Sequence, residues 1–439
     1  MATNSYLPDG WQLVKLRALG EVNRGRSRHR PRYAEHLYGG PYPFIQTGDI
    51  KASGGRITKY TQTYSAAGLA QSRLWPAGTM CITIAANIAE TGILEFPACF
   101  PDSVIGFVAD PAKCDAHFIE YVFRRLRRQI QREATGSVQD NINLATLDRL
   151  ALSLPPLQEQ RAIAYVLGTL DDKIQLNQRT NETLEAMARA IFKSWFVDFD
   201  PVRAKAEGRK PLGMEAATAT LFPDSFQDSP LGKIPKGWRV GRASELTELS
   251  RDTINPLESP REAFDHYSIP AFDDGRWPKE ETGAEIRSNK YLVPPNAVLL
   301  SKLNPRIRRV WLPTVHDDRR SIASTEFLVT LPTRDTSREY IYALFSSQPF
   351  LEVFTGLVTG TSGSHQRVQP KSLLDIEVVL PPAACRASFG RIAGPLFDGV
   401  SRNVAEVRTL AAIRDALLPK LISGEIRVRT ESSVATEIA

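Results

Sequence analysis

Residues 153–199 read SLPPLQEQRAIAYVLGTLDDKIQLNQRTNETLEAMARAIFKSWFVDF, and this stretch decides the fold. From Ile163 onward, one stripe of residues advances by alternating steps of four and three over more than four heptads. That spacing is typical of a helix that packs along a second helix. The stripe consists of Ile163, Leu167, Leu170, Ile174, Asn177, Asn181, Leu184, Ala188, Ile191 and Trp195.

The stripe returns 226 residues later, where eight of the ten aligned residues are apolar. Two long helices from a repeated unit predict an antiparallel coiled coil, although the pattern also fits two amphipathic helices that each pack on their own domain. Four poor helix formers, Gly390, Gly394, Pro395 and Gly399, lead us to expect a second helix that starts late, near Leu396, or kinks in its first turns. The aligned positions are Phe389, Ala393, Leu396, Val400, Asn403, Val407, Leu410, Arg414, Leu417 and Leu421.

One aligned pair of stripe positions is asparagine in both copies, Asn177 and Asn403. Asn177 lies near the middle of its stripe, and near-central positions of an antiparallel pair face each other. We therefore expect the two asparagines to meet, because a polar pair in an apolar seam can fix register at some cost in stability. Asn181, which aligns with Val407, is expected at the solvated edge of the seam.

The globular stretches repeat as well. LPDGW at Leu7 returns as IPKGW at Ile234, an offset of 227, and SLPPL at Ser153 returns as VLPPA at Val379, an offset of 226. Because the order of landmarks is the same in both halves, the chain reads as a dimer fused into one polypeptide. The predicted boundaries are 1–155 for the first globular domain, 156–199 for the first helix, 200–230 for a linker, 231–380 for the second globular domain, 381–424 for the second helix and 425–439 for a tail.

Both globular domains are predicted to be mixed α/β. Short apolar runs such as TMCITIAA (79–86) and EFLVTL (326–331), bounded by Gly, Pro or Asp, have the length and composition of strands. HFIEYVFRRLRRQIQR (117–132) has helical periodicity, and its arginines 124, 125, 127 and 128 are expected on a solvated face.

Composition sets broad limits. The 439 residues carry a formal net charge of +6, which permits a polyanionic partner without requiring one. No apolar run of membrane-spanning length and no signal-peptide pattern occur, so a soluble, cytoplasmic protein is expected. The four cysteines lack the spacing of a disulfide framework or a zinc site and are expected to be buried small hydrophobes.

The familiar catalytic motifs are absent from the sequence. It contains no GxxxxGK[ST] phosphate loop, no GxGxxG after a strand, no HExxH and no NPP-aromatic loop of the amino-methyltransferase type. We therefore predict no catalytic residue and no metal site, although the scattered histidines and carboxylates could still assemble into a site in space.

An ordered set of motifs resembles the specificity (S) subunit of type I DNA restriction-modification systems. The set comprises PFIQTGDI (43–50), LPPLQEQRAIA (154–164), FKSWFVDFDPV (192–202), FPDSFQDSPLGKIPKGW (222–238) and STEFLV (324–329), and the resemblance extends to about Val428. It implies two target-recognition domains that each read one part of a bipartite, asymmetric DNA sequence and are separated by two long helices packed as an antiparallel coiled coil.

The resemblance also implies partners. Two modification (M) subunits would carry S-adenosylmethionine and methylate adenine, and restriction (R) subunits would use ATP and Mg to translocate and cleave DNA. The S subunit itself would be non-catalytic and would bind none of these cofactors. The family pattern fails in one place, where LPPLQEQR becomes LPPAACRA, so contacts of Gln158, Glu159 and Gln160 should lack close counterparts at the second helix.

Candidate DNA-binding residues follow from the chemistry of phosphates and base edges, which favours cations and amides on loops. Each of these segments could equally be an ordinary solvated surface, and Gly48 and Asp49 are expected to have structural roles. The candidates in the first domain are Arg24, Arg26, Arg28, Arg30, Gln46, Thr47, Lys51, Ser137, Gln139 and Asn141. Those in the second domain are Lys302, Asn304, Arg306, Arg308, Arg309, Ser364, Gln366 and Arg367.

The helices would also act as a ruler. A stripe of 33 residues at ~1.5 Å per residue is roughly 50 Å long, and one turn of DNA measures about 34 to 36 Å. Lengthening both stripes by one helical turn should therefore lengthen the spacer between half-sites. Two other readings stay open at this point: a self-contained restriction or methyltransferase enzyme, and a coiled-coil scaffold without a DNA role.

Overall fold

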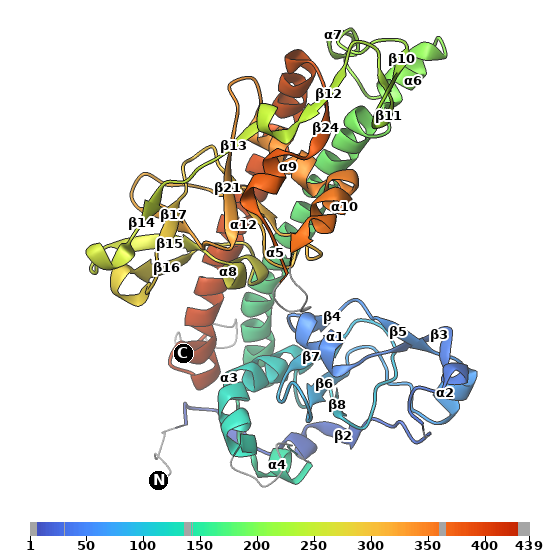
Figure 1. Ribbon diagram of the computed structural model, residues 1–439. Coiled ribbons are helices and arrows are strands. Elements are labelled where there is room, and N and C mark those ends of the chain that lie inside the picture. Colours follow the sequence, from blue (N-terminus) through green and yellow to red (C-terminus); the bar gives the residue numbers. More distant parts are fainter. Residues whose placement is uncertain (1–6, 30, 136–141, 143, 360–365, 429–439) are drawn as a thin grey trace. The chain divides into compact units, whose positions relative to one another are not determined.

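The computed structural model describes residues 7–29, 31–135, 142, 144–359 and 366–428. The chain divides into two compact units, one formed by Met1–Ile174 with Thr409–Ala439 and the other by Gln175–Arg408. Each unit contains one globular part and one segment of each of two long helices, α5 (Leu157–Phe196) and α12 (Ala383–Ser423) (Figure 1). The predicted class, two mixed α/β parts combined with two long helices, is confirmed.

The first globular part is built on a five-stranded sheet of order β2-β8-β6-β7-β4, antiparallel except for the β4–β7 pair. These strands are β2 (Gly20–Arg24), β8 (Val104–Ala109), β6 (Met80–Thr83), β7 (Thr91–Leu94) and β4 (Arg56–Ile57). The remaining elements are the strand pairs β1 (Gln12–Val14) with β9 (Leu152–Leu154) and β3 (Tyr38–Phe44) with β5 (Gln62–Tyr64), and the helices α1 (Thr47–Ala52), α2 (Ala66–Ala70), α3 (Ala116–Thr135) and α4 (Leu144–Arg149).

The second globular part has two larger sheets, of orders β13-β21-β18-β19 and β14-β17-β20-β15-β16. The strands of the first are β13 (Thr247–Leu249), β21 (Phe327–Pro332), β18 (Val298–Ser301) and β19 (Val310–Trp311). Those of the second are β14 (Thr253–Ile254), β17 (Lys290–Leu292), β20 (Arg320–Ala323), β15 (Ala263–Tyr267) and β16 (Lys279–Thr282).

Smaller elements complete the second unit. Three strand pairs are β10 (Phe226–Ser229) with β11 (Gly232–Pro235), β12 (Arg239–Arg242) with β24 (Glu377–Leu380), and β22 (Val358–Thr359) with β23 (Arg367–Val368). The helices are α6 (Asp200–Ala206), α7 (Ala216–Ala219), α8 (Ile269–Asp273), α9 (Arg338–Ser346), α10 (Gln348–Gly356) and α11 (Pro370–Leu374).

The sequence landmarks of the repeat have a structural explanation. In both halves the strand after the Gly-Trp pair is antiparallel to the strand before the Pro-Pro pair: β1 pairs with β9, and β12 pairs with β24. A strand near the start of each globular part therefore pairs with its last strand. Because of this pairing, the tryptophan before the first strand lies near the start of the long helix that follows the second strand. Both tryptophans, Trp11 and Trp238, are buried.

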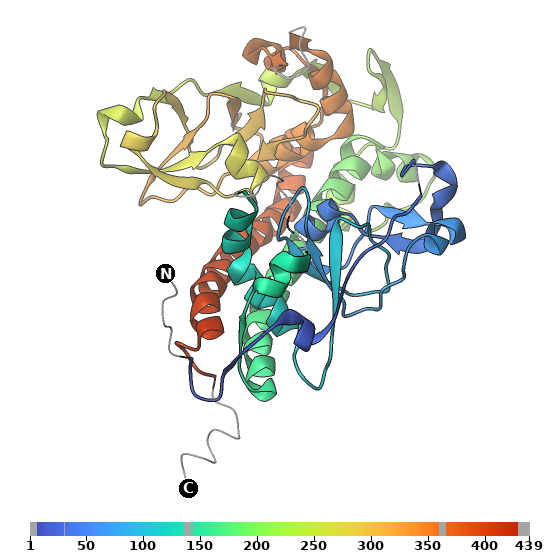
Figure 2. The ribbon, with the colours of Figure 1, turned by 90° about the horizontal axis from the view of Figure 1, so that it is seen from below.

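Within each unit, α5 and α12 pack antiparallel. In the first unit Asp171 of α5 bonds Arg414 of α12. In the second unit a Cβ on Gly399 would lie 3.0 Å from Leu184, and Phe192 lies against Phe389 with ring centroids 5.6 Å apart. Figure 2 also shows the green part of α5 beside the orange-red part of α12. Positions along α5 rise as those along α12 fall, which confirms the predicted antiparallel packing.

The expected late start of the second helix near Leu396 is wrong, because α12 is one continuous helix from Ala383. Packing compensates for the poor helix formers. Gly399 gives Leu184 of the neighbouring helix room to approach, as the 3.0 Å distance to a built Cβ shows. Pro395 is exposed, so the carbonyl that loses its helical partner there can be solvated. Tertiary packing has overridden local propensity.

The expected pairing of Asn177 with Asn403 is wrong, because each asparagine bonds a different residue. The Nδ2 of Asn177 donates to Oε2 of Glu406 at 2.9 Å, and Nδ2 of Asn403 donates to Oδ1 of Asn181 at 2.8 Å. Asn181 is accordingly half-buried and part of the seam, whereas we expected it at the solvated edge. Asn177 itself is 4% exposed, so the stripe does carry a buried polar position.

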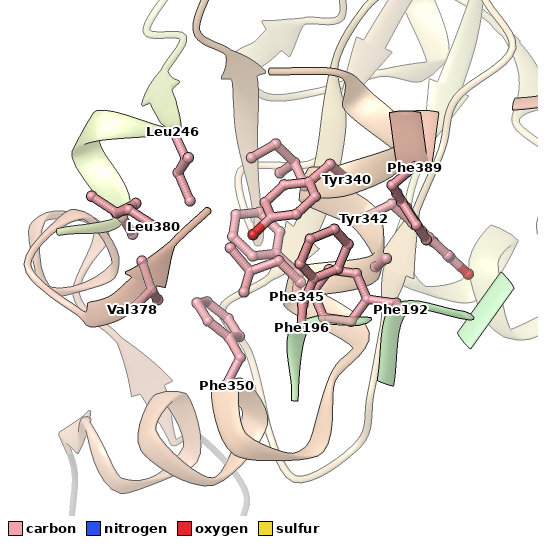
Figure 3. Close-up of a cluster of buried hydrophobic side chains, with 14 of the residues drawn as sticks. Phe192, Phe196, Leu246, Tyr340, Tyr342, Phe345, Phe350, Val378, Leu380 and Phe389 are labelled. Carbon is pink, nitrogen blue, oxygen red and sulfur yellow. The ribbon is translucent and has the colours of Figure 1, made fainter. Parts of the chain in front are cut away.

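The core of the second unit is strongly aromatic. Phe192 of α5 lies against Tyr340 of α9, with ring centroids 5.5 Å apart, and against Phe389 of α12 (Figure 3). Phe345 and Phe350 extend the same cluster between α9 and α10. Aromatic pairs add stability beyond the area they bury, so the second globular part is firmly attached to both helices.

Candidate nucleic-acid interface

Two predicted DNA-binding segments of the second globular part lie side by side. The loop that joins β18 to β19 contains Lys302 and Asn304, and strand β23 begins at Arg367. The N–H of Asn304 donates to the carbonyl of Gln366 at 2.9 Å, and the N–H of Val368 donates to the carbonyl of Lys302 at 3.0 Å. Segments about 60 residues apart in the chain are thus joined by backbone hydrogen bonds.

The loop holds its shape through its backbone. Asn304 has a positive φ of 49°, which asparagine tolerates better than most residues. Its Oδ1 is buried and has no hydrogen-bond partner in the described part of the chain. Buried polar atoms are normally paired, so this oxygen is an exception within the loop.

The three arginines of the loop differ in their surroundings. Arg306 and Arg308 are exposed, and Arg308 donates to the carbonyl of Ser346 at 3.3 Å. Arg309 is only 9% exposed, and it forms a double hydrogen bond with Asp273 of α8, both at 2.8 Å. This bond lowers the pKa of Asp273. Its burial and its carboxylate partner indicate that Arg309 holds the loop against α8, not that it contacts DNA.

Arg367 also has an internal partner. Its Nη2 and Nε bond the carboxylate of Glu326 at 2.9 and 3.0 Å, and the hydrogen bond raises the pKa of Arg367. The N–H of Lys302 donates to the carbonyl of the same Glu326 at 3.0 Å. Glu326 therefore links the loop to β23, and Lys302, half-buried, lies at the centre of this junction. Ser364 lies outside the described residues.

In the first globular part three arginines share one side of a strand and its extension. Arg24, Arg26 and Arg28 are exposed and alternate with buried Gly25 and Ser27, as the two-residue period of extended chain dictates. Gly25 donates to the carbonyl of Val104 at 2.9 Å, which attaches this segment to the sheet. The result is a row of cations on a rigid backbone. Arg30 lies outside the described residues.

The Gln46–Lys51 candidates are divided between structural and exposed positions. Gln46 caps α1 and donates from Nε2 to Gln62 at 2.6 Å. Asp49 accepts from the N–H of Gln46 at 2.9 Å and from Thr61 at 3.0 Å, as expected of a structural residue. Thr47 is half-buried, and Lys51 is exposed. Of this group, Lys51 is the residue best placed to meet a ligand.

Sequence reasoning missed one loop. Residues 84–90 of the first globular part follow β6 as the 302–309 loop follows β18, and the carbonyl of Ile84 accepts from Ile142 at 3.2 Å, just as Lys302 accepts from Val368. The loop contains Ala86 and Ala89 at positive φ and no cation, so a search for basic residues could not find it. Extending the repeat alignment through the two strands would have done so. The candidates Ser137, Gln139 and Asn141 lie outside the described residues.

The arginine run on α3 is only partly solvated. Arg125 and Arg128 are exposed as expected, but Arg124 is largely buried and Arg127 is half-buried, bonding the carboxylate of Glu90 at 3.1 Å. The prediction failed for these two because the sequence does not show that carboxylates lie opposite them. Arg124 and Arg127 are therefore structural residues.

The cysteines are buried as expected. All four cysteines are buried and unpaired with one another. Among the residues that the structure describes, no three His, Cys, Asp or Glu side chains are grouped so that they could hold a metal ion, and none of the helices has the length and apolar character needed to cross a membrane.

The lost Glu-Gln pair has the consequence expected for Glu159 and, in part, for Gln160, whose Oε1 accepts from the N–H of Asp115 at 2.9 Å whereas the side chain of Arg386 has no acceptor atom. Trp11 donates its indole N–H to Glu159 at 3.2 Å, whereas the indole N–H of Trp238 is buried without a partner in the described chain, since Cys385 occupies the position of Glu159. Gln160 donates to the carbonyl of Pro155 at 2.9 Å, and its counterpart Arg386 donates to the equivalent carbonyl of Pro381 at 2.5 Å.

Comparison with known proteins agrees with this architecture. Residues 8–186 match the family described as type I restriction modification DNA specificity domain. The type I restriction enzyme MjaIX specificity subunit of Methanocaldococcus jannaschii is 25% identical, over 96% of this chain and 95% of that protein. The HindI specificity subunit of Haemophilus influenzae is 26% identical, over 67% of this chain and 73% of that protein.

A solved structure shares the fold. The S subunit of a type I restriction-modification system from M. genitalium aligns with a TM-score of 0.56 at 14% identity, covering 96% of this chain and 98% of that one. The resemblance predicted from the motifs is therefore confirmed over nearly the whole chain.

Proposed function

We propose that this chain, a relative of the specificity subunits of type I restriction enzymes, is the DNA-recognition subunit of such an enzyme. Each globular part reads one half of a bipartite, asymmetric DNA sequence, and α5 and α12 set the distance between the halves. The chain is itself non-catalytic. It directs adenine methylation by M subunits, which carry S-adenosylmethionine, and DNA cleavage by R subunits, which use ATP and Mg.

One observation carries the assignment of a reading surface. The 302–309 loop and the start of β23 are joined by backbone hydrogen bonds, so two segments chosen for DNA-binding chemistry form one surface. Arg306 and Arg308 are exposed on it. Arginine can bind guanine with two hydrogen bonds in the major groove or neutralise a phosphate, and an exposed pair on a rigid loop can do either.

The proposal is tested by purifying the chain alone and together with the M subunits encoded with it. Sequence-dependent adenine methylation in the mixture, and none from the chain alone, is the expected result, and a methylome of the host with and without the gene would give the sequence. Methylation or cleavage by the lone chain would instead support a self-contained enzyme. DNA binding in neither preparation would favour a coiled-coil scaffold.

A loop variant tests the reading surface. Replacing both Arg306 and Arg308 with glutamine should relax or weaken recognition of one half-sequence only. Loss of a base contact should cost about 1–3 kcal/mol of binding free energy, whereas loss of a phosphate contact should change the slope of log K against log salt concentration by about one. Lys233→Gln, which removes an exposed cation from β11, serves as the control. Equal loss at both half-sequences would show that the surface does not read one half.

A further inference from the structure

A buried charge cluster joins the first globular part to both long helices. It consists of Glu120 and Arg124 on α3, Asp171 on α5 and Arg414 on α12. The side chains of Glu120 and Asp171 are only 3% and 11% exposed. Its two carboxylates and two guanidinium groups balance in charge, and all four residues belong to the first compact unit.

Asp171 is the centre of the cluster. Its carboxylate accepts from Tyr121 Oη at 2.8 Å, from Arg124 Nη1 at 2.9 Å and from Arg414 Nη1 at 2.8 Å. Two of these donors lie on α3 and the third on α12, so a single side chain of α5 is bonded to two other elements. Hydrogen bonds of this kind, between charged groups, are stronger and more directional than neutral ones.

Arg124 extends the connection to the sheet side of the globular part. It donates to Glu120 at 2.6 Å and to the carbonyl of Gly54 at 2.8 Å, and Thr91 of β7 donates to Glu120 at 2.8 Å. Burial opposes the charge of Arg124, but attraction to Glu120 and Asp171 outweighs it and the pKa of Arg124 is raised. The cluster is thus fully paired, which a buried set of charges requires.

In the second unit the positions aligned with this cluster carry uncharged side chains. When the two halves of the sequence are aligned, Tyr342 corresponds to Glu120, Phe397 to Asp171 and Ala188 to Arg414. Tyr342 and Phe397 pack edge to face, with centroids 4.9 Å apart, and Ala188 is fully buried. These aligned positions therefore do not need charges for a globular part to pack on the helices; the second unit has its ion pair elsewhere, between Glu185 of α5 and Arg276.

We propose that Asp171 and Arg414 are positioning residues that fix the orientation of the first globular part on the helix pair. A different arrangement of α3 against α5 and α12 would leave desolvated charges of this cluster without partners, so the ion pairs favour one orientation. This inference rests on the proposed function: if each globular part reads one half-sequence, its orientation helps to set the spacer at which both halves are read together.

The test uses the complex with M subunits and a set of DNA duplexes in which the two half-sequences are separated by spacers of different length. Arg414→Leu places a leucine at a seam position and removes one bond to Asp171. We expect the preference for the native spacer over one longer or shorter by one base pair to fall about tenfold. Arg414→Lys should restore it to within about twofold of the original chain, and Tyr121→Phe should lower it in the same direction but less.

Arg402→Leu is the matched control, because it removes an exposed arginine from the same helix, and it should leave the spacer preference unchanged. Two results would overturn the inference. If Arg414→Leu and Tyr121→Phe lost methylation equally at every spacer, the cluster would only stabilise the fold. If both variants kept the original spacer preference, the cluster would not position the globular part. Failure of the proposed function looks different, because the original chain would then support no sequence-dependent methylation at all.

Discussion

At the scale of single residues, two adjacent glycines show how local space limits the sequence. Both Gly54 and Gly55 have positive φ values, +61° and +103°. A Cβ on Gly54 would meet no atom within 4 Å, whereas a Cβ on Gly55 would lie 1.7 Å from a terminal nitrogen of Arg124. The second glycine is therefore needed for space as well as for its backbone conformation.

This difference gives a paired prediction. Gly54→Ala should lower the free energy of unfolding by about 1 kcal/mol, the usual cost of a left-handed residue with a side chain. Gly55→Ala should cost about 3 kcal/mol or more, because Arg124 must also leave buried carboxylates. Urea unfolding of the two variants would measure both, and equal losses would show that Arg124 moves aside without cost.

Glu159 offers a second test at this scale. It is 5% exposed, and it accepts from the indole N–H of Trp11 and from Arg427, whose Nε lies 2.6 Å away. Glu159→Ala leaves the buried indole unpaired and should cost about 2 kcal/mol of unfolding free energy.

Glu159→Gln keeps an acceptor for Trp11 and loses the ion pair with the half-exposed Arg427. We therefore expect it to lower the unfolding free energy by about half as much as Glu159→Ala. Thermal or urea denaturation of both variants decides the matter. If glutamine proved as damaging as alanine, the ion pair, not the indole bond, would be the important contact.

At the scale of elements, the sequence predicted the two long helices and their antiparallel packing but not the partners along the seam. Heptad spacing shows which face of a helix is buried. The same buried face results if one helix slides along the other, so the spacing does not fix which residues meet. Asn177 bonds Glu406, three residues beyond the aligned Asn403. The level at which the helices meet depends on where the globular parts attach, which the stripe alone does not encode.

The same limit applies to charges. Arg414 reads as an interruption of the apolar stripe, and Arg124 as part of a solvated basic run, because their partner Asp171 is distant in sequence from both. Exposed candidates such as Arg24, Arg26 and Arg306 could be chosen from local sequence, since alternation and turn residues suffice. Which arginines have internal carboxylate partners, as Arg309 does, could not.

Asn177→Leu tests the polar position of the seam. Glu406 is exposed, so it can be solvated once its partner is lost, and the leucine adds apolar burial. We expect a gain of about 1 kcal/mol in unfolding free energy together with a weaker preference for the native DNA spacer. Denaturation and the spacer assay measure the two effects, and a less stable variant would show that Asn177 makes a net stabilising contact.

At the scale of the whole molecule, helix length should determine the spacer. Asn177 to Asn181 of α5 and Asn403 to Glu406 of α12 lie at the same level. Seven residues inserted into each segment preserve the heptad seam and add ~10 Å. The preferred DNA spacer should then grow by about three base pairs, with both half-sequences unchanged.

Methylation of duplexes with graded spacers, compared with a chain that carries the insertion in α5 alone, provides the measurement. The single insertion lengthens only one helix, so residues beyond it no longer meet their partners on α12, and methylation should be abolished at every spacer. An unaltered preferred spacer in the double insertion would exclude the helices as the ruler.

The unpaired indole of Trp238 has an evolutionary meaning. If two identical half-length chains made this assembly, one gene would supply both copies of every contact, and a cysteine in place of glutamate would remove the partner of both tryptophans at once. In the fused chain, Glu159 and Cys385 are separate positions. Each half can therefore accumulate its own substitutions while the other keeps its contacts, and the two halves are free to diverge independently.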